Sequence, residues 1–276
     1  MYETLSTAAA AVKRRPFPML QTTRPNRRYA VWLSGPNTAA AEIARQVGYG
    51  AAVLDIEHGT FDLAALERFI PLCKAIGLEV IAKVLGPERG PIQQALDFGA
   101  DVVAIPHIEN ADHARAITAF AKFPPLGDRS FAGGRTSTYG GFTDDWVREQ
   151  DSRTRCYPMI EDAGAIEQIA DILALDTVDG VFIGPSDLSL RRGRGAYTRD
   201  DGDFADLTAV AAAANAAGKP WLLPAWSSAE KQFAVERGAD QLVLTMEHGA
   251  LLAGFTAAHA EVTDLDRMPS LSGTAR

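Results

Sequence analysis

One group of ionisable residues stands directly after an apolar run and is suited to chemistry. Residues 54–59 read Leu-Asp-Ile-Glu-His-Gly, so Asp55, Glu57 and His58 follow the apolar run 51–54. Two carboxylates and an imidazole at the end of a buried strand are costly unless they are paired, hydrated or bound to a ligand. We therefore interpret this strand end as a candidate site.

A second segment, residues 180–189, has the same character. Its apolar start runs into the turn Gly184-Pro185, which is followed by Ser186 and Asp187. Such a turn presents consecutive backbone N–H groups, which suit an anion such as a carboxylate. The segment predicts a binding site for a small acid.

Composition narrows the class of protein. The chain has 276 residues, 47% of them hydrophobic, which is enough for a large core. A net charge of -8 argues against sequence-independent binding of nucleic acid, which needs a basic face. Apolar runs stay below the roughly 18 residues of a membrane span, and the first 25 residues lack the apolar stretch of a secretory signal. Cys73 and Cys156 have no metal or disulfide spacing, so we expect reduced thiols in a cytoplasmic protein.

Eight apolar segments have the length of strands. Their continuous apolar character is typical of parallel strands that are covered on both faces. The predicted strands are 29–34, 51–56, 79–84, 101–106, 156–161, 180–185, 220–224 and 241–246.

Helical patterns separate these strands. We predict helices over 38–47, 62–75, 92–98, 111–120, 163–173, 204–217 and 228–237, with Asp62, Asn110 and Ser227 or Ser228 as N-caps. A repeat of helix, glycine and apolar strand recurs at Gly48, Gly99 and Gly238, where the glycines fit helix C-caps. Eight such units predict an α/β fold, a (β/α)₈ TIM barrel; a doubly wound open sheet is the alternative.

Three parts are expected along the chain. Residues 1–27 would form an N-terminal arm, 28–261 the catalytic barrel, and 262–276 a C-terminal tail. Residues 122–155 contain no strand pattern, and a long irregular segment in a compact domain is usually functional or disordered. Arg129 and Arg135 in this segment are expected to face solvent or a second subunit.

In a barrel, the carboxyl ends of the strands carry the catalytic groups. The predicted strands deliver ionisable side chains there, and Glu161 and Asp187 are suited to coordinate one hard divalent ion through oxygen atoms. The full set comprises Asp55, Glu57, His58, Lys83, His107, Glu161 and Asp187.

Each residue also has an ordinary structural interpretation. Asp55 or Glu57 could form an ion pair with a neighbouring strand, and His58 could be a neutral, hydrogen-bonded imidazole. Residues 244–249 repeat Glu-His-Gly but carry Thr245 where Asp55 stands. Part of the pattern could therefore belong to the loop, and the aspartate is the discriminating residue.

Together the motifs resemble the HpcH/HpaI aldolase and citrate lyase family. Within it, they are most similar to the 2,4-dihydroxyhept-2-ene-1,7-dioate type of class II pyruvate aldolase. The resemblance spans about residues 28 to 256. It is carried by residues 54–59, by Leu-Asp-Phe-Gly at 96–99, by Pro-Pro-Leu-Gly-Asp-Arg at 124–129, by Met-Ile-Glu at 159–161 and by 178–189 with Gly-Pro-Ser-Asp-Leu-Ser.

The resemblance implies a metal-dependent barrel that cleaves a 4-hydroxy-2-oxo acid to pyruvate, or a related 2-oxo acid, and an aldehyde. Mg²⁺, Mn²⁺ or Co²⁺ would be held by Glu161 and Asp187. His58, oriented by Asp55, would be the acid/base, and Asp97 would support the site from a second layer. It also implies a homo-oligomer, a hexamer or trimer, with C-terminal helices exchanged between subunits.

The N–H groups of Ser186 and Asp187, after Gly184, would hold the pyruvate carboxylate in such an enzyme. Lys83 would polarise the keto oxygen where the family has arginine; a lysine cannot make the same bidentate contact. Met159 stands where the family often has glutamine, and His107 where an apolar residue is expected.

Two other hypotheses remain open. Lys83 could form a Schiff base, or the site could catalyse another carbon–carbon lyase or decarboxylase reaction on a 2-oxo acid. The chain could also be a non-catalytic barrel that binds a small acid.

Overall fold

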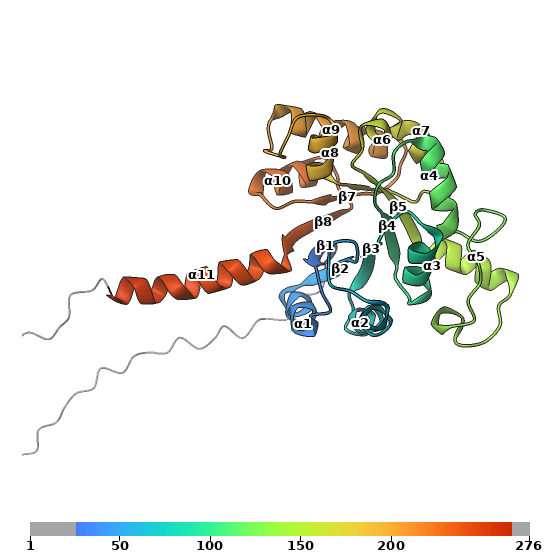
Figure 1. Cartoon of the computed structure of the whole chain (residues 1–276), viewed down its shortest axis with the longest axis horizontal. Coiled ribbons are helices and arrows are strands. Elements are labelled where there is room, and N and C mark those ends of the chain that lie inside the picture. Colours follow the sequence, from blue (N-terminus) through green and yellow to red (C-terminus); the bar gives the residue numbers. More distant parts are fainter. Residues whose placement is uncertain (1–25, 267–276) are drawn as a thin grey trace, which may run out of the picture.

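Eight parallel strands close into a barrel in the computed structural model, which describes residues 26–266 (Figure 1). Each strand pairs with the next along the chain, and β8 pairs with β1. The (β/α)₈ prediction is confirmed and the open sheet is excluded. The strands are β1 Asn26–Leu33, β2 Tyr49–Asp55, β3 Glu79–Lys83, β4 Val102–Ile105, β5 Arg155–Ile160, β6 Val181–Ile183, β7 Trp221–Pro224 and β8 Gln241–Met246.

Helices alternate with the strands and cover the outside of the barrel. Asp62, Asn110 and Ser227 cap their helices as expected, and Gly48 and Gly238 adopt the left-handed conformation that ends a helix. The helices are α1 Thr38–Val47, α2 Leu63–Ala75, α3 Arg89–Asp97, α4 Ala111–Thr118, α5 Asp144–Arg153, α6 Ala163–Glu167, α7 Ile169–Leu173, α8 Pro185–Arg191, α9 Asp201–Ala216, α10 Ser228–Glu236 and α11 Glu247–Asp266, with 3₁₀ turns η1 Ala119–Ala121 and η2 Arg135–Ser137.

The core has two layers because side chains alternate across each strand. One set fills the barrel interior, from Ala51 and Val53 of β2 to Tyr157 and Met159 of β5. The larger set packs between the strands and the helices. The inward-facing set matters most for function, since it fixes which side chains emerge at the end of the barrel.

The connection between β4 and β5 contains no strand, as expected, but it contains helix α5. The expectation that Arg129 is exposed is wrong. Its side chain is buried, it pairs with Asp97 at 2.7 Å, and it stacks on the ring of Phe123. This burial depends on a partner 32 positions away, which local pattern cannot show. Arg135 is exposed, as expected, and lies 3.5 Å from Glu67.

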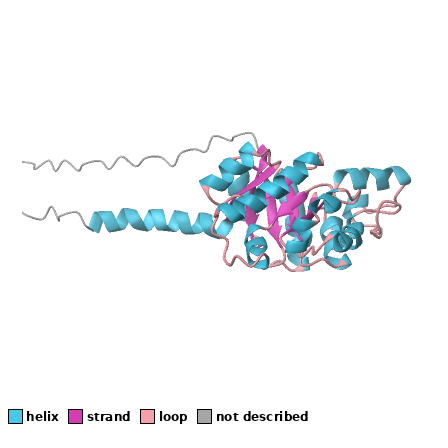
Figure 2. Ribbon diagram, turned by 90° about the horizontal axis from the view of Figure 1, so that it is seen from above, coloured by secondary structure: helices cyan, strands magenta, loops and turns pink. Residues whose placement is uncertain are grey.

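Helix α11 projects away from the barrel in both views (Figures 1 and 2). It continues to Asp266, past the expected boundary at residue 261. Most of the expected arm and the end of the expected tail lie outside the described residues, so the three-part division stays a prediction. Within residues 26–266, no helix combines the length and the apolar character needed to cross a membrane.

Candidate active site

Strand parity places the charged residues of the site. Ala51 and Val53 face the barrel interior, so Asp55, two residues further along β2, faces it as well. Lys83 faces the interior for the same reason, since it lies two residues after inward-facing Ile81. Asp55 and Lys83 are paired in the register of β2 and β3. Two opposite charges therefore meet at the carboxyl end of the barrel.

Asp55 is buried and held by three donors. Its Oδ1 accepts from Nζ of Lys83 at 3.2 Å and from the backbone N–H of His58 at 3.3 Å. Its Oδ2 accepts from Nε1 of Trp32 at 3.1 Å. Asp55 thus orients the backbone of His58, while the imidazole ring points elsewhere.

Glu57 is the centre of the charged group. Its Oε2 pairs with Lys83 and lies 3.4 Å from Nε2 of His58, and its Oε1 lies 2.6 Å from Nε2 of His107. Burial works to raise the pKa of this carboxyl, but the hydrogen bond and charge of Lys83, with the two histidines, outweigh it and lower the pKa. Glu57 is therefore a carboxylate that links three basic side chains.

Glu161 follows β5 and is buried. Its Oε1 accepts from the backbone N–H of His107 at 2.7 Å. Burial raises its pKa, and the nearby Asp187 carboxylate raises it further. A buried carboxylate beside a second one is stabilised by a cation that both can bind.

Gly184 makes room for that carboxylate. It follows β6, and a Cβ at this position would lie 2.5 Å from Oε2 of Glu161. Asp187 lies one turn further on, in the first turn of α8, and is exposed. The N–H groups of the first turn, those of Ser186 and Asp187 included, have no partner within the helix. Backbone donors and two carboxylates thus face the same strand ends.

These carboxylates fit a hard divalent cation. Both offer oxygen ligands, which Mg²⁺ and related ions prefer. Within residues 26–266, no group of three or more His, Cys, Asp or Glu residues is arranged to hold a metal ion. Glu161 and Asp187 would therefore need oxygen atoms of water or substrate to complete the shell.

The structure does not bring every predicted residue to this group. Asp97 ends α3, and that helix returns the chain to the start of β4, at the opposite end of the barrel from Asp55. Its carboxylate pairs with Arg129 there. The His58 ring is 66% exposed at the mouth of the site. Met159, which stands where the family often has glutamine, faces the barrel interior and is buried.

The repeated Glu-His-Gly motif has a different role at β8. Glu247 is buried and accepts from Nδ2 of Asn37, the N-cap of α1, at 2.5 Å. His248 is exposed at the start of α11. The repeated motif therefore has a structural role at the end of β8, where Glu247 binds the N-cap residue of α1. This agrees with the presence of Thr245 in place of aspartate.

Sequence reasoning missed one residue of the site, Trp32, and the contact that His107 makes. Trp32, at the end of β1, donates to Asp55, and its ring lies 5.8 Å from Nζ of Lys83. It is two residues after inward-facing Ala30, so strand parity could have found it. His107 was among the predicted strand-end residues, but no pattern in the sequence joins its ring to Glu57.

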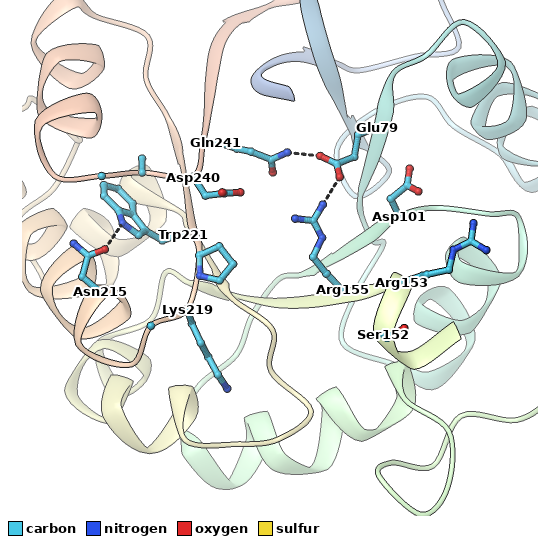
Figure 3. Close-up of a pocket in the computed structure, with 14 residues that line it drawn as sticks. Glu79, Asp101, Ser152, Arg153, Arg155, Asn215, Lys219, Trp221, Asp240 and Gln241 are labelled. Carbon is cyan, nitrogen blue, oxygen red and sulfur yellow. Dashed lines mark hydrogen bonds and ion pairs between the residues drawn. The ribbon is translucent and has the colours of Figure 1, made fainter. Parts of the chain in front are cut away.

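A large cavity of about 1210 Å³ lies at the other end of the barrel (Figure 3). Arg155 and Gln241 both reach Glu79 there, and Asn215 accepts from the Trp221 indole. These residues begin strands or precede them, so this end is remote from Asp55. We interpret the ion pair of Arg155 with Glu79 as part of a polar cluster that closes this end of the barrel.

Comparison with known proteins identifies the family of this chain. The model of the HpcH/HpaI aldolase/citrate lyase family matches residues 28–222, more than half of the chain. The chain belongs to this family. The expected resemblance is thereby confirmed, and family members similar to the chain are aldolases, which are carbon–carbon lyases.

Three relatives illustrate the similarity. The chain is 32% identical over 190 residues to the 4-hydroxy-2-oxovalerate aldolase of Novosphingobium aromaticivorans, covering 68% of this chain and 72% of that one. It is 33% identical over 159 residues to the 2-dehydro-3,6-dideoxy-6-sulfogluconate aldolase of Pseudomonas putida, with 57% and 62% covered. The crystal structure of an HpcH/HpaI aldolase from Desulfitobacterium hafniense DCB-2 matches with a TM-score of 0.78, at 27% identity, over 89% of this chain and 95% of that one.

Proposed function

We propose that this protein is a divalent-metal-dependent aldolase. It would reversibly cleave a 4-hydroxy-2-oxo acid to pyruvate, or a related 2-oxo acid, and an aldehyde. The observation that carries the proposal is the buried Glu161 carboxylate, which is close enough to Asp187 to feel its charge, at the same end of the barrel as Lys83 and His58. The aldolase names of the relatives support the reaction class.

Three kinds of group would bind the 2-oxo acid: backbone N–H donors, a metal ion and a lysine ammonium. The N–H groups of Ser186 and Asp187, after Gly184, hold the carboxylate of the substrate, as helix N-termini hold anions. Glu161 and Asp187 would hold the divalent ion, which as a Lewis acid would stabilise negative charge on the substrate. Lys83 adds a fixed positive charge near the keto oxygen.

Cleavage of the C3–C4 bond requires a base. His58 takes the proton of the 4-hydroxyl, the C4–O bond becomes the aldehyde carbonyl, and the electron pair of the broken bond passes to C3 of the 2-oxo acid. Since Nε2 of His58 lies 3.4 Å from the Glu57 carboxylate, we assign Nδ1 as the proton acceptor. The same proton is then available to C3, which completes pyruvate.

A Schiff base at Lys83 is the alternative. The buried position of Lys83 beside the site favours it. Its contacts with Asp55 and Glu57 oppose it, because these carboxylates pair with an ammonium, whereas the nucleophile is the neutral amine. The metal-dependent mechanism therefore accounts for more of the contacts.

The test uses metal-stripped protein with Mg²⁺, Mn²⁺ or Co²⁺ added back. Exchange of the pyruvate methyl protons for deuterium, followed by NMR, needs no knowledge of the aldehyde; aldol addition is then measured over an aldehyde panel. We expect metal-dependent exchange and turnover. Metal-independent turnover with a pyruvate adduct trapped by borohydride would support the Schiff base. Pyruvate binding with neither exchange nor turnover would support the non-catalytic barrel.

We also propose a homo-oligomer, a trimer or hexamer, in which α11 is exchanged between subunits. Each strand of a (β/α)₈ barrel is usually followed by a helix that covers it, but α11 leaves the barrel (Figure 2). It exposes Leu252 and Phe255. The neighbouring helices also expose apolar side chains, Ile43 on α1 and Val235 on α10.

The oligomer is tested by light scattering after size-exclusion chromatography. Phe255→Glu should lower the mass of the assembly, while Thr256→Glu on the same helix should lower it less. A wild-type monomer at micromolar concentration would refute the exchange. The expected cytoplasmic location and the expected lack of nucleic-acid and membrane partners stay predictions from the sequence.

A further inference from the structure

His107 has an unusual backbone conformation. It follows β4, and its φ is 59°, in the left-handed region that non-glycine residues seldom adopt. Residues held in such conformations cluster at functional sites, where the surrounding structure maintains them. In this conformation the N–H of His107 donates to Oε1 of Glu161 at 2.7 Å.

The ring of His107 extends from the same backbone to the opposite side of the site. Its Nε2 lies 2.6 Å from Oε1 of Glu57, and its Nδ1 lies 3.4 Å from Nη2 of Arg191. An arginine only donates hydrogen bonds, so Nδ1 is the acceptor and Nε2–H donates to Glu57. Arg191 is itself held by Asp162 at 2.9 Å.

These contacts form one chain across the mouth of the barrel. It runs from Asp162 through Arg191 and His107 to Glu57 and Lys83. It therefore joins the segments after β5, β4 and β2 to the end of α8 and the end of β3. Glu57 can rotate about its side-chain bonds unless both of its oxygens are held. Lys83 holds one oxygen and His107 holds the other.

We propose that His107 is a positioning residue for the reaction, and this rests on the proposed function. Its ring fixes the Glu57 carboxylate against Lys83 and His58, and its backbone N–H fixes Glu161. Both ring nitrogens are engaged by neighbouring side chains, so the ring itself neither binds the metal ion nor takes a proton from substrate.

The two roles are separated by His107→Gly. Glycine adopts positive φ without strain, so the backbone hydrogen bond to Glu161 is kept while the ring is lost. Loss of one charge-assisted hydrogen bond on Glu57 should lower kcat by about 10–100-fold. The KM for the 2-oxo acid should change less than about threefold, because its own contacts remain. Tyr139→Gly is the matched control, since Tyr139 also has a φ of 60° but lies in an exposed loop.

A double-mutant cycle with Glu57→Gln tests the contact itself. In the Glu57→Gln background, His107→Gly should lower kcat by less than about twofold. Additive losses, a rise in KM with kcat unchanged, a His107→Gly enzyme within twofold of wild type, or an equal loss in Tyr139→Gly would each overturn the proposal.

A spectroscopic measurement makes the result independent of turnover. In ¹⁵N-histidine-labelled wild-type protein, the His107 ring should show the Nε2–H tautomer, and Glu57→Gln should shift its Nε2 resonance. An unchanged resonance would show that the ring does not contact Glu57 and would overturn the positioning role. If wild type lacks both exchange and turnover while this shift is present, the proposed function fails and the contact stands.

Discussion

Gly184 and Glu161 lie so close that a Cβ on the glycine would stand 2.5 Å from Oε2 and 2.7 Å from Cβ of the glutamate. They follow adjacent strands, β6 and β5, so the approach of the two segments is fixed by the barrel itself. A side chain at position 184 cannot be accommodated unless the Glu161 carboxylate moves. Gly184 therefore determines where one of the two proposed metal ligands can lie.

We predict that Gly184→Ala weakens metal binding and lowers turnover by about 10–100-fold, the usual cost of disturbing the support of a metal ligand. Metal affinity is measured by calorimetry with Mn²⁺, and turnover by aldol cleavage. Gly90→Ala, at a position with no atom within 4 Å of the added Cβ, is the control. If Gly184→Ala bound Mn²⁺ with the wild-type affinity, the assignment of Glu161 as a metal ligand would be wrong.

Metal removal gives the second prediction. Chelation should abolish turnover, and Mg²⁺, Mn²⁺ or Co²⁺ should restore it. Metal should also raise the melting temperature of wild type, because a bound ion stabilises the folded state alone, and this rise should be lost in Glu161→Gln and in Asp187→Asn. Full activity in protein shown by elemental analysis to be metal-free would refute the mechanism.

Strand ends could be predicted from the sequence, and long-range pairs could not. The bounds of β8 coincide with the predicted 241–246, since apolar runs between glycines mark buried strands well. The position of Asp55 and Glu161 at the ends of those runs then placed both residues at the carboxyl ends of their strands. The pairing of Arg129 with Asp97 and of His107 with Glu57 depends on loops and rotamers that no local pattern encodes. Only the family resemblance indicated that the C-terminal helix leaves the barrel. The sequence of α11 alone is equally compatible with a helix that packs on β8, the strand before it.

Lys83 carries the third prediction. If it acts as a fixed charge paired with Asp55 and Glu57, Lys83→Arg should keep part of the activity and Lys83→Ala should lose most of it. A Schiff-base nucleophile would make the two variants equally inactive. Mass spectrometry after borohydride treatment with pyruvate decides the matter independently, since an adduct on Lys83 would rule out the proposed mechanism.

Glu230 gives a prediction about stability and pH. It is fully buried in the capping box of α10, where it accepts from the Tyr197 hydroxyl and the backbone N–H of Ser227 and forms an ion pair with Arg199 at 2.9 Å. Burial works to raise its pKa, but the Arg199 guanidinium and the hydrogen bonds from Ser227 and Tyr197 outweigh it and hold the pKa below its ordinary value. A lowered carboxyl pKa stabilises the folded state above the ordinary value and ceases to do so as the pH falls through the lowered one.

Glu230→Gln should therefore reduce the free energy of unfolding by about 1–3 kcal/mol at pH 7, and the deficit should narrow as the pH falls below about 4. Urea unfolding at several pH values measures this. Glu236→Gln, at the exposed end of the same helix, should change little at any pH. A deficit that is constant from pH 7 to pH 3 would show that the charge of Glu230 does not stabilise the fold.

His58 separates chemistry from binding. If its ring takes the proton of the 4-hydroxyl, His58→Ala should lower kcat for aldol cleavage by roughly 10²–10⁴, the usual contribution of a general base. Pyruvate should still bind, since its proposed contacts are the metal ion and backbone N–H groups. Asp55→Asn should give a partial defect, because Asp55 holds the backbone of His58 and the ammonium of Lys83. His248→Ala, in the repeated motif at β8, should cost little at the chemical step. Near-wild-type turnover in His58→Ala, or a larger loss in folded His248→Ala, would end the assignment of His58 as the base.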